Sequence, residues 1–309
     1  MKGPLPIRRL VSHGSIPVDL AIGLPRLPER GGDVLATWSA KNAGGGFNVL
    51  SAAVRLGLPA IYAGPHGTGP FGDIVRAALA AEGIACLQRQ TPALDTGFCV
   101  VLVEGGADGE RTFVTVAGAD AVVDSSVLRA IAYREGDAVY VSGYDLAYPG
   151  AGIAVAEHVA GLQAGHLLVF DPGPLVAEIP AKLLASVLER ADVVSLSTRE
   201  AGMLGGAETL LARLHPGAAI VLRAAEDGAS IMRAGVASVP VPGVGVPVVD
   251  STGAGDVHVG ALLAGLAVGL DLPEATLLAN RAAAYSVGQR GPAAGPTQEQ
   301  LKDFGRGRW

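Results

Sequence analysis

Cysteine, basic charge and long apolar runs are all scarce in this chain. Only Cys86 and Cys99 occur among 309 residues, and neither has Cys or His neighbours at metal-ligand spacing, so neither a disulfide framework nor a zinc site is expected. The formal net charge of −6 leaves no basic field for nucleic acid. The longest apolar stretch, 257–270, is too short and too glycine-broken to cross a bilayer. We therefore expect a cytoplasmic protein without nucleic-acid or membrane partners.

Two common catalytic signatures are also absent. No G-x-x-x-x-G-K-[ST] sequence occurs, which excludes a Walker-type nucleotide site, and no serine stands in a G-x-S-x-G elbow. The segment 67–72 formally matches the G-x-G-x-x-G fingerprint and keeps a Rossmann-type oxidoreductase open as an alternative. However, Pro70 and Phe71 crowd that turn, and no strand ending in an acidic residue follows about 20 residues later. Absence of NAD(P)H binding would dispose of this alternative.

Apolar, strand-like runs alternate with helical segments through most of the chain. The predicted strands are 138–141, 167–170, 193–196, 219–222 and 247–249, and the predicted helices are 150–163, 181–190, 207–214, 256–269 and 272–287. Continuous Val/Leu/Ile strands separated by helices predict a mostly parallel sheet that is covered on both faces. With no linker or repeat, residues 1–309 are expected to form a single α/β domain.

Two stretches, at roughly 19–45 and 97–117, depart from this rhythm. Alternation such as Phe113-Val114-Thr115-Val116 suits half-exposed strands. We expect the two insertions to form a small β-sheet lid on the main domain. Because a bare apolar β face and edge rarely stay in water, we also expect a homodimer that forms through the lids.

The run Asp250-Ser251-Thr252-Gly253-Ala254-Gly255-Asp256 follows an apolar segment and opens a predicted helix. Small side chains at Gly253, Ala254 and Gly255 leave backbone N–H groups bare, and the helix start adds a positive dipole end, so a phosphate can bind there. Asp256 stands at the rim of this anion hole. A carboxylate in that place can accept the proton of a hydroxyl group that attacks phosphorus, which predicts phosphoryl transfer.

The same run, D-S-T-G-A-G-D, resembles the C-terminal signature of the ribokinase or PfkB family of sugar and nucleoside kinases. The block Ala43-Gly44-Gly45-Gly46-Phe47-Asn48, followed by a helix that ends near Gly57, is similar to the family's N-terminal motif. Between the two blocks, 108–113 and 118–120 are similar to the family's lid segment. The resemblance spans 14–296. It implies a ribokinase-like three-layer α/β/α domain with a central, mostly parallel sheet, a small β-sheet lid and ATP-dependent kinase activity.

The resemblance assigns the substrate pocket to several residues. The segment 14–19 looks like the family's first strand and turn, in which an aspartate, here Asp19, accepts hydrogen bonds from sugar hydroxyls. Gly44 and Gly45 would let a polyol approach the backbone, Asn48 offers a donor and an acceptor together, and Arg111 belongs to the lid segment. Asp19 as a solvated turn residue and Asn48 as a helix cap remain alternatives.

The nucleotide side departs from the family pattern. In the family's N-x-x-E motif, Ser197 replaces the asparagine and Glu200 is retained, so Glu200 is expected to hold Mg²⁺ through water. A T-x-G segment is replaced by Arg223-Ala224-Ala225, and only the later Gly228 is kept. Arg223 is either a phosphate-binding charge or a solvated arginine at the strand end.

Two further assignments follow from the resemblance. Asn280 stands where the family places an asparagine beside adenine. Asp250 and the Thr252 backbone would form a monovalent-cation site for K⁺, which the loop 288–295 closes. His258, about 200° around the helix from Asp256, is either a core residue or a substrate contact.

The expected reaction is transfer of the γ-phosphoryl group of ATP to a primary hydroxyl group of a sugar. Asp256 would be the general base, and the backbone of Gly253, Ala254 and Gly255 would form the anion hole, with Mg²⁺ and K⁺ as further cofactors. A nucleoside kinase on the same scaffold is one alternative. A non-catalytic sugar-binding relative, whose phosphate site has decayed at Ser197 and Ala225, is another.

Overall fold

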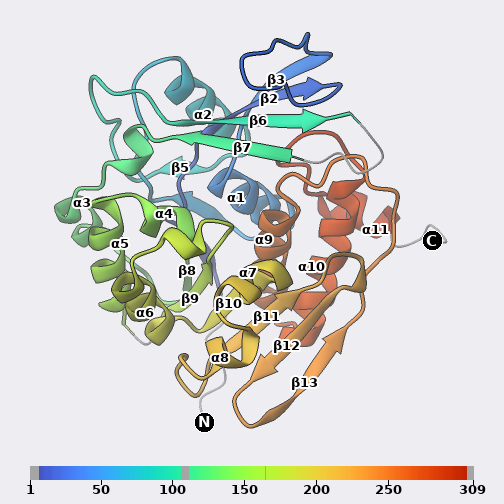
Figure 1. The fold of residues 1–309 in the computed structure, drawn as a ribbon. Helices are drawn as coiled ribbons and strands as arrows, with labels where there is room; N and C mark the ends of the chain where they lie inside the picture. The colour runs from blue at the N-terminus through green and yellow to red at the C-terminus, as the bar shows by residue number, and fades with distance from the viewer. Residues whose placement is uncertain (1–6, 106–110, 164, 305–309) are drawn as a thin grey trace.

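A large sheet forms the centre of the molecule (Figure 1). The structure, a computed structural model, describes residues 7–105, 111–163 and 165–304. In this part of the chain the sheet has nine strands in the order β13-β12-β11-β10-β9-β8-β1-β4-β5. Their bounds are β1 Arg9–Ser12, β4 Ala60–Tyr62, β5 Ala85–Cys86, β8 Asp137–Ser142, β9 Leu167–Asp171, β10 Val193–Ser197, β11 Ala219–Arg223, β12 Ala229–Arg233 and β13 Val236–Val241. All neighbours from β11 to β5 are parallel, whereas β12 is antiparallel to both of its neighbours.

Helices cover both faces of this sheet, because successive residues of each buried strand contact opposite cores. One core includes Tyr140 and Val169 and packs against helices α1 Gly46–Arg55, α2 Pro70–Ala81, α9 Ala254–Ala267, α10 Leu272–Val287 and α11 Gln298–Phe304. The other includes Val141 and Phe170 and packs against α3 Ser125–Arg129, α4 Gly143–Ala147, α5 Ala151–Ala160, α6 Ala181–Arg190, α7 Thr198–Met203 and α8 Ala207–Leu211. Short 3₁₀ turns lie at Ala119–Ala121, Val176–Glu178 and Ala225–Asp227. The predicted three-layer α/β/α fold is confirmed.

A second, four-stranded sheet with the order β3-β2-β6-β7 lies beyond one end of the main sheet (Figure 1). Its strands are β2 Val18–Leu24, β3 Trp38–Ala43, β6 Phe98–Glu104 and β7 Arg111–Val116, and they lie within or beside the two predicted insertions. The central pair β2 and β6 is parallel, and both outer pairs are antiparallel. The residues 108–110 of the predicted lid segment lie outside the described residues.

The base of the β6–β7 hairpin is held by one buried carboxylate. Oδ1 of Asp120 accepts hydrogen bonds from Gly97 N at 2.5 Å and from Gly118 N at 3.2 Å, and Tyr148 donates to Oδ2 at 3.3 Å. Burial raises the pKa of Asp120. Both ends of the hairpin therefore meet at one oxygen atom.

Two predictions about strands were wrong. The segment 14–19 is not the first strand, because β1 ends at Ser12 and Asp19 lies in β2 of the small sheet. The predicted strand 247–249 does not form. The β12–β13 hairpin occupies the sheet edge instead, and the N–H groups of Val249 and Asp250 both donate to the carbonyl of Val287 at the end of α10.

Polar residues end the central strands at the carboxyl edge of the large sheet. Ser142 is paired in register with Asp171, and Ser197 with Arg223. Ligands of parallel α/β sheets bind outside this edge. None of the helices in the described ranges combines the length and the apolar character that a membrane span requires.

Candidate active site

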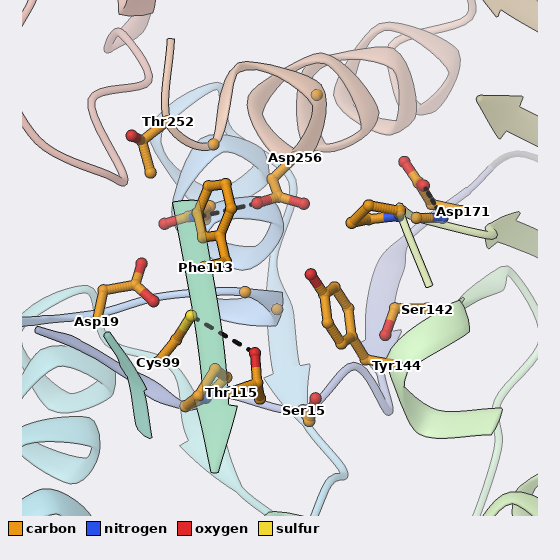
Figure 2. Close-up of a pocket in the computed structure, with 18 of the residues that line it drawn as sticks. Ser15, Asp19, Cys99, Phe113, Thr115, Ser142, Tyr144, Asp171, Thr252 and Asp256 are labelled. Atoms are coloured by element: carbon orange, nitrogen blue, oxygen red, sulfur yellow. Dashed lines mark hydrogen bonds between the residues drawn. The ribbon is translucent and has the colours of Figure 1, made fainter. Parts of the chain in front are cut away.

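A cavity of about 420 Å³ lies between the carboxyl edge of the large sheet, the small sheet and the start of α9. Its size is within the usual range for a small-molecule site. Figure 2 shows the side chains that reach it: Asp19, Cys99, Phe113 and Thr115 from the small sheet, Tyr144 from α4 and Asp256 from α9. The fold therefore brings together segments that are far apart in the sequence.

The start of α9 supplies backbone N–H groups beside a carboxylate. Gly253 precedes the helix with φ 73°, a left-handed conformation that favours glycine, and a Cβ there would also lie 2.8 Å from Asn48 Nδ2. The helical ladder begins with Val257 N donating to Gly253 O at 2.8 Å, so the N–H groups of Gly255 and Asp256 precede it. The N–H of Ala254 donates to Ser251 O at 3.2 Å. Of the three predicted anion-hole donors, Ala254 is thus already engaged.

Asp256 is bonded to a side chain of α1. Asn48 Nδ2 donates to Asp256 Oδ2 at 2.9 Å, a contact that joins the two sequence motifs. Burial raises the pKa of Asp256 to about 7, and the nearby Asp171 adds to this rise, whereas the Asn48 hydrogen bond and the Arg223 charge oppose it. A carboxyl group with this pKa is suited to accept a proton near neutral pH.

Asn48 is not a helix cap, because Gly45 occupies the N-cap position of α1. Its Oδ1 atom is buried and has no hydrogen-bond partner among the described residues. A buried acceptor without a donor is costly, so a donor group supplied by a ligand would satisfy this atom.

Asp19 lies on β2 with only 8 % of its surface exposed, which excludes the solvated turn residue. Burial raises its pKa to about 7, and no side chain or backbone group of the described residues donates a hydrogen bond to its carboxylate. A Cβ at Gly44 would overlap the Asp19 carboxylate, and Gly45 adopts φ 52°. Gly44 therefore makes room for Asp19, whereas Gly45 lines the cavity itself.

Arg223 lies beside the start of α9, where its Nη1 atom donates to Gly255 O at 3.4 Å. Its Nη1 atom donates to Asp171 Oδ2 at 2.7 Å and to Ser195 Oγ at 2.9 Å, and Nη2 lies 3.6 Å from Glu200 Oε2. Only 13 % of the Arg223 side chain is exposed, so it is not a solvated arginine. Burial alone would lower its pKa, but the carboxylates of Asp171 and Glu200 raise it.

Glu200 lies at the cavity wall and also completes a capping box at the start of α7. Its Oε2 accepts from Ser197 N at 2.7 Å, and Ser197 Oγ accepts from Glu200 N at 3.2 Å. Ser197 thus performs a local structural task in place of the family's asparagine.

Across the described ranges, no cluster of three His, Cys, Asp or Glu side chains is arranged to hold a metal ion. One carboxylate at the wall fits a Mg²⁺ ion that is bound mainly by phosphate and water.

Arg111 and Asp250 form an ion pair at the rim of the cavity. Arg111 Nη2 lies 2.6 Å from Asp250 Oδ1, and Nη1 donates to Ser251 Oγ at 3.0 Å. Thr252 N donates to the same Asp250 oxygen at 2.9 Å. The predicted substrate residue and the predicted cation-binding residue are therefore bonded to each other.

Gly228 and Asn280 lie outside this cavity and converge on the segment 241–243. Asn280 Nδ2 donates to Pro242 O at 2.9 Å, and its Oδ1 lies 3.0 Å from His258 Nε2. A Cβ at Gly228, where φ is 91°, would overlap Val241 O and Gly243 N. His258 is 3 % exposed, and burial lowers its pKa to about 3, so it is a core residue. These residues shape the chain that follows β13.

Several residues of the cavity were missed in the sequence, among them Asp171, Tyr144 and the small-sheet residues Cys99, Phe113 and Thr115. Asp171 follows a predicted strand at the carboxyl edge, where an acidic side chain is a usable signal, and it holds Arg223. Tyr144 lines the cavity from α4, just after β8. Its exposure to the cavity depends on how α4 packs, which periodicity does not reveal.

A family model described as pfkB family carbohydrate kinase matches residues 8–299 of the chain. Among curated proteins, the sugar kinase YegV of Escherichia coli (strain K12) is 35 % identical over 298 residues, which cover 93 % of this chain and 91 % of that protein.

Solved structures have the same fold. A ribokinase of Arabidopsis thaliana, complexed with ribose and ATP, superposes with a TM-score of 0.75 at 20 % identity and covers 98 % of this chain and 100 % of its own. A nucleoside kinase of Burkholderia thailandensis, in complex with inosine, gives a TM-score of 0.79 at 21 % identity and covers 96 % and 98 %.

Proposed function

The chain belongs to the PfkB family of carbohydrate kinases, and from this premise we propose that it transfers the γ-phosphoryl group of ATP to a primary hydroxyl group of a neutral sugar. One observation carries the proposal. The carboxylate of Asp256, bonded to Asn48 at 2.9 Å, stands at the open N–H groups of α9 and faces a cavity lined by Asp19. A base, an anion hole and a hydroxyl-binding carboxylate thus share one cavity.

Each residue has a distinct task in the proposed reaction. Asp19 and the Asn48 Oδ1 atom orient the sugar hydroxyl groups, because both are buried acceptors. Asp256 accepts the proton of the attacking hydroxyl group as its oxygen bonds to the γ-phosphorus and the bond to the β-phosphate oxygen breaks. The N–H groups of Gly255 and Asp256, backed by Arg223, stabilise the negative charge that builds up on the transferred group.

Mg²⁺ is proposed to be bound with ATP beside Glu200, where it would neutralise phosphate charge. The ATP requirement is supported by the Arabidopsis ribokinase complexed with ribose and ATP, which has the same fold. A monovalent cation bound through Asp250 is not part of this proposal, because Arg111 already occupies that carboxylate.

The charges of the cavity favour a neutral polyol over a sugar acid or a sugar phosphate. The sugar-side lining includes Asp19 and Asp256, and the cations Arg111 and Arg223 are paired with Asp250 and Asp171. The further lining cation, Arg199, lies next to Glu200, on the side proposed for the nucleotide. The carboxylate or phosphate group of a charged sugar would be repelled by the carboxylates of Asp19 and Asp256. Hydroxyl groups, in contrast, can donate to those carboxylates.

A nucleoside is the second candidate, and two aromatic side chains favour it. Phe113 and Tyr144 both reach the cavity (Figure 2), and aromatic rings provide surface against which a base can pack. The nucleoside kinase with the same fold was solved in complex with inosine.

The test is ADP release from Mg·ATP with a panel of neutral sugars, sugar acids, sugar phosphates and nucleosides. The proposal expects turnover with at least one neutral sugar, and turnover about 10²- to 10⁴-fold slower with Asp256→Asn. Turnover confined to nucleosides would support the second candidate. Sugar binding without turnover of any compound would support a non-catalytic sugar-binding protein.

The small sheet is proposed to act as a lid and as a dimer interface. Val114 and Val116, on the face of β7 that points away from the cavity, and Trp38, at the start of the edge strand β3, are each 41–53 % exposed. Apolar surface on a four-stranded sheet with two free edges favours pairing with a second copy.

A further inference from the structure

Asp250 joins four segments of the chain. Its Oδ1 atom accepts from Arg111 of β7 at 2.6 Å and from Thr252 N at 2.9 Å. Thr252 belongs to the segment 250–255 before and at the start of α9, which we call the phosphate loop. The Oδ2 atom of Asp250 accepts from Gly291 N at 3.0 Å, and the N–H of Asp250 donates to Val287 O at 3.0 Å. The carboxylate thus connects the lid, the phosphate loop and the loop that follows α10.

The Arg111–Asp250 pair is largely shielded from solvent. The two side chains are 12 % and 14 % exposed, so their attraction is screened less by salt than that of a surface pair. The second guanidinium nitrogen donates to Ser251 Oγ, which fixes Arg111 against two successive residues of the phosphate loop. Such two-point contacts suit the planar fork of arginine.

This arrangement does not fit the monovalent cation that the family resemblance implies at Asp250. Like Ca²⁺ and Mg²⁺, a hard monovalent cation is bound by oxygen atoms that have free lone pairs. Here both carboxylate oxygens face N–H donors, and one of them already faces a full positive charge. Burial acts to raise the pKa of Asp250, but the hydrogen bonds from Thr252 and Gly291 and the charge of Arg111 lower it below its usual value. Asp250 is therefore an ionised carboxylate whose countercharge comes from the chain itself.

We propose that the Arg111 guanidinium takes the place of a monovalent cation at Asp250 and is a positioning residue for the phosphate loop. The inference rests on the proposed function insofar as this loop binds phosphate. Because Arg111 comes from the lid, the countercharge reaches Asp250 only when the lid lies over the cavity. Lid closure and ordering of the phosphate loop are then one event, and nucleotide binding does not depend on K⁺.

The experiment measures binding of Mg·ADP by calorimetry, without sugar, in KCl and in tetramethylammonium chloride at equal ionic strength. Wild-type affinity is expected to agree within about twofold between the two salts, since each tenfold change needs about 1.4 kcal/mol of new interaction. Arg111→Gln is expected to bind about tenfold more weakly in tetramethylammonium and to regain affinity in KCl, because K⁺ can then reach the vacated carboxylate. Arg111→Lys, which keeps the charge, is expected to lose less affinity.

Lys41→Gln is the matched control, because it removes one positive charge from the exposed face of the same small sheet. It should bind Mg·ADP like the wild type in both salts. Circular dichroism melts establish that each variant is folded.

Two outcomes would overturn the inference: wild-type binding that strengthens fivefold or more in KCl, or Arg111→Gln that binds as tightly as the wild type in tetramethylammonium. Since no sugar is present, failure of sugar phosphorylation would reject the proposed function and leave this result standing.

Discussion

Asn48 Nδ2 lies 2.9 Å from Asp256 Oδ2, which joins two residues 208 positions apart in the chain. The hydrogen bond fixes the orientation of the carboxylate and favours its charged form. Burial works in the other direction and raises the pKa of Asp256 to about 7. The balance of these two effects sets the pH at which Asp256 can act as a base.

Replacement of Asp256 by Asn should lower kcat by roughly 10²- to 10⁴-fold, because the proton acceptor is lost. Sugar affinity, measured by calorimetry, should change little, since the amide keeps the shape of the carboxylate. Glu178→Gln, which alters an exposed carboxyl group that does not line the cavity, is the control. Turnover of Asp256→Asn within threefold of the wild type would remove Asp256 from the mechanism.

The pH dependence of kcat/KM should show an acidic limb near pH 7. Asp256 must be deprotonated to accept a proton, so the rate falls as the pH drops through its pKa of about 7. Asn48→Ala removes a hydrogen bond that lowers this pKa, so the acidic limb should move to higher pH. This shift does not depend on how far the substitution lowers the maximal kcat/KM. Ser51→Ala, on the next turn of α1, should leave the limb in place. A limb that stays fixed or moves to lower pH in Asn48→Ala would contradict the assignment.

Asp19→Asn should weaken sugar binding and yet stabilise the fold at pH 8. Affinity should fall about ten- to a hundredfold, the cost of about 1–3 kcal/mol for a hydroxyl group that loses its charged acceptor. The folded-state pKa of about 7 is raised above the unfolded value, so the stability that Asp19 contributes is present below about pH 4 and is lost as the pH rises through 7.

The amide does not titrate, so the gain in melting temperature over the wild type should be larger at pH 8 than at pH 5. Thermal melts at both pH values measure it, with exposed Asp33→Asn as the control. An equal gain at both pH values would show that Asp19 does not titrate in this range.

Exchange of alanine and glycine should change the stability of the fold in opposite directions at Ala225 and at Gly228. Ala225 adopts φ 50°, a left-handed conformation that costs an L-residue roughly 1–2 kcal/mol, so Ala225→Gly should leave stability unchanged or raise it by about 1 kcal/mol. Gly228→Ala should lose more than about 2 kcal/mol, because its Cβ would overlap Val241 O and Gly243 N. Chemical denaturation compares the two, and a larger loss for Ala225→Gly would contradict the structure.

A homodimer is expected in solution at micromolar concentration, as measured by sedimentation. Trp38→Ser removes the largest exposed apolar side chain of the small sheet and should increase the monomer fraction. Val122→Ser, at an exposed site outside that sheet, should not. A strictly monomeric wild-type protein would reject the proposed lid pairing.

The features that were predictable from sequence are local. Asp250 to Asp256 lie in one continuous run, and the apolar strands that end at Asp171 and Ser197 repeat at helix-separated intervals. Short-range patterns of this kind place the phosphate loop and the carboxyl edge of the sheet without knowledge of tertiary contacts.

What was not predictable depends on packing between distant segments. The ion pair between Arg111 and Asp250 requires the lid to lie over the phosphate loop, and Asn280 lies away from the cavity because its amide is used by Pro242 and His258. The segment 247–249 has the composition of a strand, but the β12–β13 hairpin forms the sheet edge and the N–H of Val249 donates to Val287 O at the end of α10. Composition reports the preference of a segment and says nothing of which neighbours are available to it.

The two hydrogen bonds from Gly97 and Gly118 to Oδ1 of Asp120 tie the base of β6 to the base of β7 through one buried oxygen atom. Tilting both legs together preserves the two bonds, whereas spreading the legs breaks at least one of them at a buried acceptor. Because β6 is also paired with β2 along its whole length, the carboxylate of Asp120 matters most for the position of β7, whose only strand partner in the described sheet is β6. Cys99 and Thr115 are paired across β6 and β7 and both line the cavity, so the buried Asp120 carboxylate also holds the spacing of two cavity side chains.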